Sequence, residues 1–206
     1  MLSRTTISAE IDAKFYSYDW RNGLAILKAV HAKEWLDIST VLAEFSLKKS
    51  HLIAKGRGNK SEMAGLLDGA LYKRGWIEKA FDTKIVVDGV ERPTPTHSVD
   101  CFTGRVALEV EWNNKDPFFD RDLNNFRLLY ELHVIDVGVI VTRSTELQGW
   151  LKTNHKLFGK QPETYGVSTT HDDKLISRIL GGGAGGCPVV VFAIRKEAYE
   201  DDGPAQ

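Results

Sequence analysis

Three things are scarce in this sequence: cysteine, long apolar runs and net charge. The two cysteines, Cys101 and Cys187, lie far apart without metal-ligand spacing, and a lone pair cannot define a disulfide framework. So little cysteine fits a reducing compartment best. No apolar run approaches the ~20 residues of a membrane span, and the polar N-terminus has no recognisable signal peptide. We therefore expect a cytoplasmic protein that does not insert into a membrane.

The balance of charge argues against a general polyanion binder. The chain has 27 Lys and Arg against 28 Asp and Glu, a net charge of −1, whereas a general nucleic-acid binder is basic overall. An enzyme that acts on nucleic acid stays compatible with this count, because acidic metal ligands in its cleft offset basic clusters elsewhere. A chain of 206 residues suffices for one substantial core, so we expect a single domain over residues 1–206.

The apolar pattern predicts a helical N-terminal part over about residues 18–75. Ser61 is placed to cap a helix that ends at Gly75. Before that helix, apolar side chains recur at near-helical spacing. They are Leu24, Ile26, Leu27, Val30, Trp35, Leu36, Val41, Leu42 and Phe45.

Residues from about 76 to 196 have the pattern of an α/β core, followed by a tail at 197–206. The segments 105–112 and 135–142 have the composition of strands, and Asp116-Pro117 opens a helix between them. Strand, helix and strand in this order form a βαβ unit with a parallel strand pair. The other elements expected are a tight turn at Asp88-Gly89, helices around 146–151 and 172–180, and a last strand at 188–194.

The strand at 105–112 brings two carboxylates to one side. Side chains alternate between the faces of a strand, so Glu109 and Glu111 project together, about 6.6 Å apart along the backbone. Their apolar neighbours pack on the other face. Two adjacent glutamates repel each other unless a cation or a proton lies between them. Spacing alone leaves the alternative of a solvated strand face with exposed glutamates.

A third carboxylate, Asp100, precedes this strand. A tight turn near Thr103-Gly104 would return Asp100 to the position of Glu109 and Glu111. Three converging carboxylates suit a hard divalent cation with oxygen ligands, Mg²⁺ first. These residues therefore predict a candidate metal site.

This order of elements resembles the PD-(D/E)XK nuclease core. More closely, the segment from Gly104 to Trp112, the helix after it and the strand Ile135-Asp-Val-Gly-Val-Ile140 resemble the BglII/BstYI-like family of type II restriction endonucleases. That family has the same Asp-to-Glu spacing and closely similar strands. The resemblance is clear over residues 97–142 and thin before residue 75. It implies a central mixed sheet flanked by helices, a helical N-terminal part, and hydrolysis of phosphodiester bonds in DNA.

The resemblance also implies a role for each carboxylate. Asp100 and Glu109 would hold Mg²⁺, for which Mn²⁺ can substitute, together with the backbone carbonyl of Val110. Glu111 stands where the wider superfamily has Lys and BglII-like enzymes have Gln, which puts Lys-based activation of water in doubt. Glu111 would orient the attacking water or accept its proton. We favour orientation, because two carboxylates and a metal would surround it.

An acidic residue on a helix often completes such sites. Our candidate is Glu62, at the start of the helix that begins near Ser61. The alternative is that Glu62 only stabilises the helix N-terminus by its charge. Asp68, on the same helix, is a weaker rival.

Three polar segments are candidates for contacting DNA. They are Lys55, Arg57, Asn59 and Lys60 in a glycine-containing loop; Asn113, Asn114 and Lys115 directly after the carboxylate strand; and Ser168, Thr169 and His171 before a helix. Cations and amides there suit phosphate and base contacts. The alternatives are a solvated loop for the first segment, a plain strand-to-helix turn for the second and a helix cap for the third.

Two further features predict no site. The run Gly181–Gly186 follows a helix and precedes a strand, the reverse of the order that a phosphate-binding loop needs. We therefore expect no nucleotide cofactor. Five histidines show no ligand spacing and are interpreted as surface or satisfied residues: His31, His51, His97, His133 and His155.

The leading hypothesis is a Mg²⁺-dependent type II restriction endonuclease that cleaves double-stranded DNA at a specific site. A palindromic site is best recognised by a two-fold symmetric protein, so we expect a homodimer, and the resemblance suggests a site that contains GATC. Two alternatives stay open. One is a PD-(D/E)XK nuclease of DNA repair or mobility without site specificity. The other is a DNA-binding module with a silent site, which the departure at Glu111 leaves possible.

Overall fold

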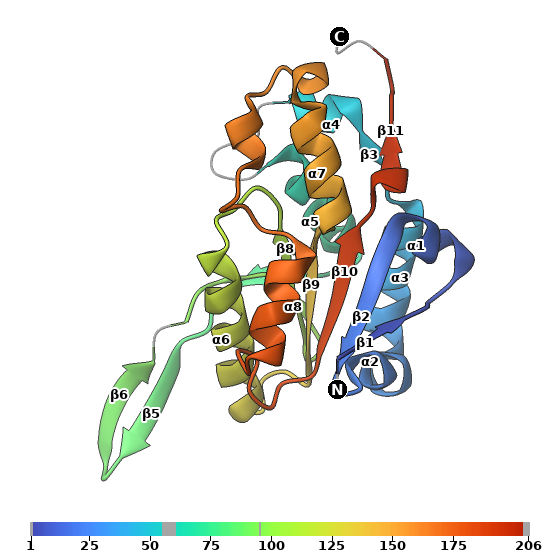
Figure 1. The fold of residues 1–206 in the computed structure, drawn as a ribbon. Helices are drawn as coiled ribbons and strands as arrows, with labels where there is room; N and C mark the ends of the chain where they lie inside the picture. Colours follow the sequence, from blue (N-terminus) through green and yellow to red (C-terminus); the bar gives the residue numbers. More distant parts are fainter. Residues whose placement is uncertain (1, 55–60, 95, 204–206) are drawn as a thin grey trace.

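A mixed seven-stranded sheet forms the centre of the fold (Figure 1) in the computed structural model, which describes residues 2–54, 61–94 and 96–203. The strand order is β1-β2-β10-β9-β8-β7-β4, in which β8, β9 and β10 are parallel and all other neighbours are antiparallel. The predicted α/β class is confirmed. The strands are β1 (Ser3–Thr5), β2 (Phe15–Trp20), β4 (Ile77–Lys79), β7 (Val99–Thr103), β8 (Val106–Glu111), β9 (Val137–Arg143) and β10 (Val189–Ile194).

The three parallel strands form the buried middle of this sheet. Every residue of β8, β9 and β10 is buried, as expected for parallel strands with both faces covered. Helix α6 (Pro117–Glu131) connects β8 to β9, which confirms the predicted βαβ unit. A residue on β8 is therefore inside the protein whichever face it points to.

Helices cover both faces of the sheet. Helices α6 and α8 (Asp172–Leu180) lie side by side on one face, and α2, α3 and α5 lie on the other (Figure 1). Among the described residues no helix combines the length and the apolar character needed to cross a membrane. The other elements are α1 (Ala9–Lys14), α2 (Gly23–Val30), α3 (Ala32–Glu44), β3 (Leu47–Lys48), α4 (Lys49–Ile53), α5 (Glu62–Tyr72), α7 (Thr145–Thr153), 3₁₀ turns at His155–Phe158, Pro162–Tyr165 and Lys196–Ala198, and β11 (Tyr199–Glu200).

The predicted start of the helical part, at about residue 18, is wrong. Residues 15–20 form β2, which pairs with β10 along its whole length. The short helix α1 precedes this strand, and the following helices, α2 and α3, begin at Gly23. The physical reason is composition: the segment Phe15-Tyr-Ser-Tyr-Asp-Trp20 is rich in aromatic residues, which favour strands. The N-terminal part therefore contributes a strand to the central sheet as well as helices to one face.

The predicted turn at Asp88-Gly89 is confirmed and closes an unusual hairpin. Both residues have positive φ (51° and 78°), as a two-residue hairpin turn requires. They join β5 (Thr83–Val87) to β6 (Val90–Thr94), and Figure 1 shows this hairpin reaching away from the body of the protein. Its exposed apolar side chains are Ile85, Val86, Val87 and Val90.

One glycine allows α6 to approach the sheet closely. Gly138 of β9 lies under Phe126 of α6, and a Cβ added at Gly138 would lie 2.3 Å from the Phe126 ring carbon Cδ2. A side chain at this position would push the helix away, so glycine here sets the distance between α6 and β8–β9.

We expect Gly138→Ala to lower the free energy of unfolding by about 1–3 kcal/mol, because the added methyl group overpacks a filled interface. The control is Gly149→Ala in α7, where an added Cβ meets nothing within 4 Å; this change should raise the free energy by about 0.5–1 kcal/mol through higher helix propensity. Urea unfolding measures both. Equal effects would contradict the close approach.

Candidate active site

The hairpin of β7 and β8 brings Asp100 beside Glu109. The two strands are joined by a two-residue turn at Gly104-Arg105, and Gly104 has a φ of 57°. The Asp100 N–H donates to Glu109 Oε2 (3.3 Å), and Asp100 Oδ2 accepts from the Val110 N–H (3.1 Å). The predicted tight turn is confirmed, and it returns Asp100 to the glutamate strand.

Glu109 and Glu111 lie on the same side of β8, but they are not on a solvated surface. Each is only 1% exposed. Helix α6 packs on that face of the sheet and closes it off from solvent. The alternative of a solvated strand face with exposed glutamates is therefore wrong.

Two further side chains join this group: Asp122 from α6 and His97 from the segment before β7. Asp122 is fully buried. His97 Nε2 lies 3.3 Å from Glu109 Oε1 and 3.2 Å from Asp122 Oδ1. The interpretation of His97 as a satisfied histidine fits these contacts, and the two buried carboxylates beside its ring also make it a potential metal ligand.

Burial and like charges raise the pKa of both glutamates. Desolvation is the larger cause for each, followed by the negative charge of Asp122. The pKa of Glu109 lies well above its usual range, and the pKa of Glu111 rises to about 9. Carboxyls in this position need a proton or a cation close to them at neutral pH.

The donor set fits a divalent cation. Glu109 Oε1 and Asp122 Oδ2 are buried, and neither oxygen accepts a hydrogen bond within the described residues. A buried oxygen without a donor is costly unless a cation meets it. Carboxylate oxygens are the ligands that hard divalent cations prefer. The residues present are therefore suited to holding a metal ion.

Glu111 is held in place from two sides. Asn114 Nδ2 donates to Glu111 Oε2 at 2.6 Å, and Arg121 Nη2 lies 3.5 Å from Glu111 Oε1. Arg121 also donates to Asp122 Oδ1 at 2.9 Å. The side chain of Glu111 is thus restrained by an amide and a guanidinium. Such a fixed carboxyl is suited to orienting a water molecule.

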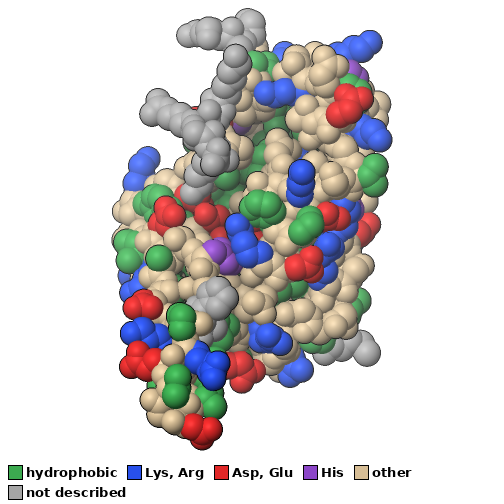
Figure 2. Space-filling model, turned by 90° about the vertical axis from the view of Figure 1, so that its left-hand side faces the viewer, with side chains coloured by type: hydrophobic (Ala, Val, Ile, Leu, Met, Phe, Trp, Pro, Cys, Tyr) green, Lys and Arg blue, Asp and Glu red, His purple; other side chains and the backbone are tan. Residues whose placement is uncertain are grey.

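The group opens onto a cleft of about 640 Å³, lined by Asp100, Val110 and Glu111 together with Asn113 and Asn114. Figure 2 looks onto this side of the molecule, where acidic side chains gather at a hollow in the surface. Glu109 and Asp122 lie behind this lining. Of the three carboxylates predicted from the sequence, Asp100 and Glu111 therefore line the cleft, and Glu109 is buried beside them.

Comparison with known protein families bears on what this cleft does. The family model for the restriction endonuclease BglII/BglIII matches residues 15–194, from the start of β2 to the end of β10. The chain belongs to the BglII/BglIII restriction endonuclease family. The resemblance inferred from the sequence is confirmed, and the protein is a nuclease that cleaves double-stranded DNA at a specific site. A search of the curated proteins finds no significant match.

The two acidic residues of α5 considered in the sequence analysis, Glu62 and Asp68, lie at different places relative to the candidate active site. Glu62 lines an adjoining cleft of about 180 Å³, next to Trp112 and Asn113, and stands in the first turn of α5. Its catalytic role stays a prediction. Asp68 is buried, and its Oδ1 accepts from Cys101 Sγ at 3.4 Å. Cys101 belongs to the core on the α5 side of the sheet.

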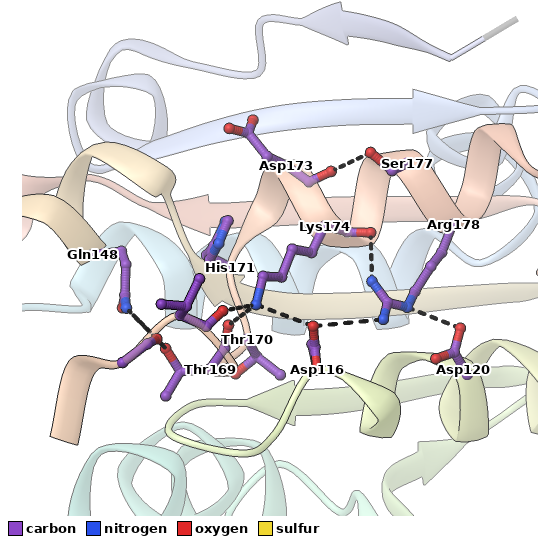
Figure 3. Close-up of polar contacts among 12 residues, drawn as sticks. Asp116, Asp120, Gln148, Thr169, Thr170, His171, Asp173, Lys174, Ser177 and Arg178 are labelled. Carbon is purple, nitrogen blue, oxygen red and sulfur yellow. Dashed lines mark hydrogen bonds and ion pairs between the residues drawn. The ribbon is translucent and has the colours of Figure 1, made fainter. Parts of the chain in front are cut away.

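Two of the three segments predicted to contact DNA lie side by side. Lys115 and Thr169 form a β-bridge, the Thr170 N–H donates to the Asn114 carbonyl (2.9 Å), and the Asp116 N–H donates to the Ser168 carbonyl (2.7 Å). Figure 3 shows the Lys174 ammonium between the Thr169 carbonyl and the Asp116 carboxylate, 3.1 Å from each. The third segment, with Lys55, Arg57, Asn59 and Lys60, lies outside the described residues.

Exposure separates the candidates in these two segments. The side chains of Asn113, Lys115 and Ser168 are exposed, so they are available to DNA. The Thr169 hydroxyl donates to the Gly166 carbonyl and accepts from Gln148 (2.7 and 2.8 Å), which leaves its predicted DNA contact without support. His171 is half-buried, with its Nδ1 3.0 Å from Thr145 Oγ1.

A buried arginine fixes the orientation of Asn113. Arg143 is fully buried, and its Nη1 donates to Asn113 Oδ1 at 2.8 Å. Burial lowers the pKa of Arg143 to about 9, so the guanidinium is charged at neutral pH, and it lies over the rings of Trp112 and Tyr165. Because the amide oxygen of Asn113 is engaged, its amide N–H groups are the atoms left to meet a ligand.

Sequence reasoning missed Asp122, although a signal for it was present. On α6 the residues Phe119, Leu123 and Phe126 are buried at helical spacing, and Asp122 and Asn125 fall on the same face. A carboxylate at a core position of an amphipathic helix must be paired or bind a cation. No comparable signal exists for His97, whose position depends on the path of the chain before β7.

We expect Glu111→Gln to raise the free energy of unfolding in EDTA by about 1–2 kcal/mol, because the amide keeps the shape of the side chain and removes a buried carboxyl that must take up a proton at neutral pH. The same change should lower DNA cleavage strongly if Glu111 accepts the proton of water, and only slightly if Glu111 orients the water, because BglII-like enzymes carry Gln at this position. Glu163→Gln, at an exposed position, is the matched control and should change neither. Chemical unfolding and a cleavage assay measure the two effects; a loss of stability in Glu111→Gln would contradict the cost of that protonation.

Proposed function

We propose that this restriction endonuclease uses Mg²⁺, held by Asp100, Glu109 and the backbone carbonyl of Val110. The observation that carries the proposal is the convergence of Asp100, Glu109 and the Val110 backbone at one open cleft, which Asp100 and Val110 line. Asp100 Oδ2 already holds the Val110 N–H, so the side chain and the backbone that would supply ligands are fixed relative to each other.

The chemistry follows from the residues around the cleft. Mg²⁺ bound at such a site lowers the pKa of water and stabilises charge on the leaving oxygen. Glu111, clamped by Asn114 and Arg121, orients the attacking water. Arg121 also brings positive charge to the edge of the cleft, where the phosphate approaches, and Mn²⁺ is expected to substitute for Mg²⁺.

DNA is held, in this proposal, by the joined segments 113–115 and 168–171. Asn113 presents amide N–H donors to the cleft, because its amide oxygen accepts a hydrogen bond from Arg143. Lys115 and Ser168 are exposed and suit phosphate contacts. Contacts by Lys55, Arg57, Asn59 and Lys60 stay predictions.

The assembly and the recognised sequence are also proposals. A homodimer matches the two-fold symmetry of a palindromic site, and a GATC-containing site follows from the resemblance described above. The cytoplasmic location expected from the sequence stays a prediction.

The decisive test incubates the protein with plasmid DNA and Mg²⁺, beside Asp100→Asn and the matched control Asp120→Asn at an exposed position of α6. We expect discrete fragments from the wild type and the control, and cleavage reduced at least 100-fold in Asp100→Asn, as on loss of a group that acts in the transition state. Smeared products would instead indicate a nuclease without site specificity. Absence of any cleavage dependent on Asp100 would overturn the proposed catalysis.

A second test separates folding from DNA contact at Asn113. In Asn113→Asp, Arg143 gains a carboxylate partner, so the free energy of unfolding should rise by about 1 kcal/mol. The cleft loses amide donors and gains a negative charge, so DNA affinity should fall at least roughly tenfold. Asn124→Asp, on the exposed side of α6, is the control. Thermal unfolding and a DNA-binding titration measure the outcome, and unchanged affinity would exclude Asn113 from the DNA contact.

A further inference from the structure

We propose that His97, Glu109 and Asp122 form a second cation site, one that takes a transition-metal ion such as Mn²⁺ in preference to Mg²⁺. It lies at Glu109 Oε1, whereas the site proposed for catalysis uses the end of Glu109 that faces Asp100. The inference shares Glu109 with the proposed function, and rests on it to that extent.

The three side chains meet from three different parts of the chain. His97 precedes β7, Glu109 lies on β8 and Asp122 on α6, and their ligand atoms all lie within 4.8 Å of one another. The His97 Nε2 atom is 3.3 Å from Glu109 Oε1 and 3.2 Å from Asp122 Oδ1. Ligand atoms bound to one ion at about 2.0–2.2 Å stand roughly 3.0–3.4 Å apart, so these separations suit a shared ion.

Unsatisfied buried atoms around the group give an independent reason to expect a ligand. Asn125, one turn after Asp122 and 3% exposed, donates through Nδ2 to the His97 carbonyl (3.3 Å), which ties the backbone of His97 to α6. Its Oδ1 is buried and has no hydrogen-bond partner in the described part of the chain, as is true of Asp122 Oδ2. Arg121 reaches only Asp122 Oδ1. The second oxygen of Asp122 is thus left for another positive group.

The mixed donor set decides the kind of ion. A site built only from carboxylate and carbonyl oxygens suits Mg²⁺, whereas an imidazole nitrogen favours transition-metal ions such as Zn²⁺ and Fe²⁺ over Mg²⁺. Mn²⁺ suits the two carboxylates of this site and is the paramagnetic ion with which a nitrogen ligand can be detected. The imidazole of His97 is half-buried, with its side chain 21% exposed, so an ion can enter from that side while both carboxylates stay enclosed.

The experiment adds Mn²⁺ to the full chain and records pulsed electron paramagnetic resonance, which detects coupling between the metal electrons and a ligand ¹⁴N nucleus. We expect ¹⁴N coupling in the wild type and its loss in His97→Gln. His133→Gln is the matched control, because His133 is exposed and belongs to neither group of potential metal ligands found among the described residues, and it should retain the coupling.

A second pair of variants uses affinity. Asp122→Asn should weaken Mn²⁺ binding at this site roughly tenfold or more, whereas Asp120→Asn, two residues earlier and exposed, should not. Circular dichroism confirms that the variants are folded, and the two pairs are independent should one variant fail to fold.

Absence of ¹⁴N coupling in the wild type, or its persistence in His97→Gln, would overturn the second site and leave His97 as an ion-paired histidine. The proposed catalysis is judged separately by Asp100→Asn on plasmid DNA. Cleavage without ¹⁴N coupling would support the nuclease mechanism and reject the second site. Coupling to ¹⁴N without cleavage would support the second site and reject the proposed catalysis.

Discussion

The mutual repulsion of buried carboxylates is the constraint on which the rest of this structure depends. Glu109 and Glu111 lie on a strand that is covered on both faces, so neither can turn toward solvent. Asp122 adds a third charge from the helix packed above them. The positive and polar groups nearby, Arg121 and Asn114 among them, offset this charge only in part. The site is therefore held ready for a cation at a cost to the stability of the fold.

The path of α6 explains how this density of charge arises. The helix follows β8 directly and packs back on the sheet as the connection of a βαβ unit. Gly138 lets Phe126 lie close against β9, and Asp122, one turn earlier on the same face, comes down onto the glutamates. A glycine on one strand thus positions an acidic group against the neighbouring strand.

Much of the fold was predictable because its signals are local. The alternation along β8, the turn after Thr103 and the proline at the start of α6 each depend on a few adjacent residues. The start of the helical part could not be predicted in this way, because β2 belongs to the sheet only through its pairing with β10, far along the chain. The same limit applies to the site: Asp100 and Glu109 lie on one hairpin, whereas His97 and Asp122 reach them through tertiary packing.

Asn114 joins two tasks that are usually considered apart. Its side chain holds Glu111, and its backbone carbonyl holds the segment that contains Ser168. A relative that acquired a different recognition segment would have to preserve this link or rebuild the carboxylate geometry as well. If segment 168–171 contacts DNA and Glu111 acts in catalysis as proposed, Asn114 couples target choice to turnover, and a change of the recognised DNA sequence would need paired substitutions rather than exchange of a single loop.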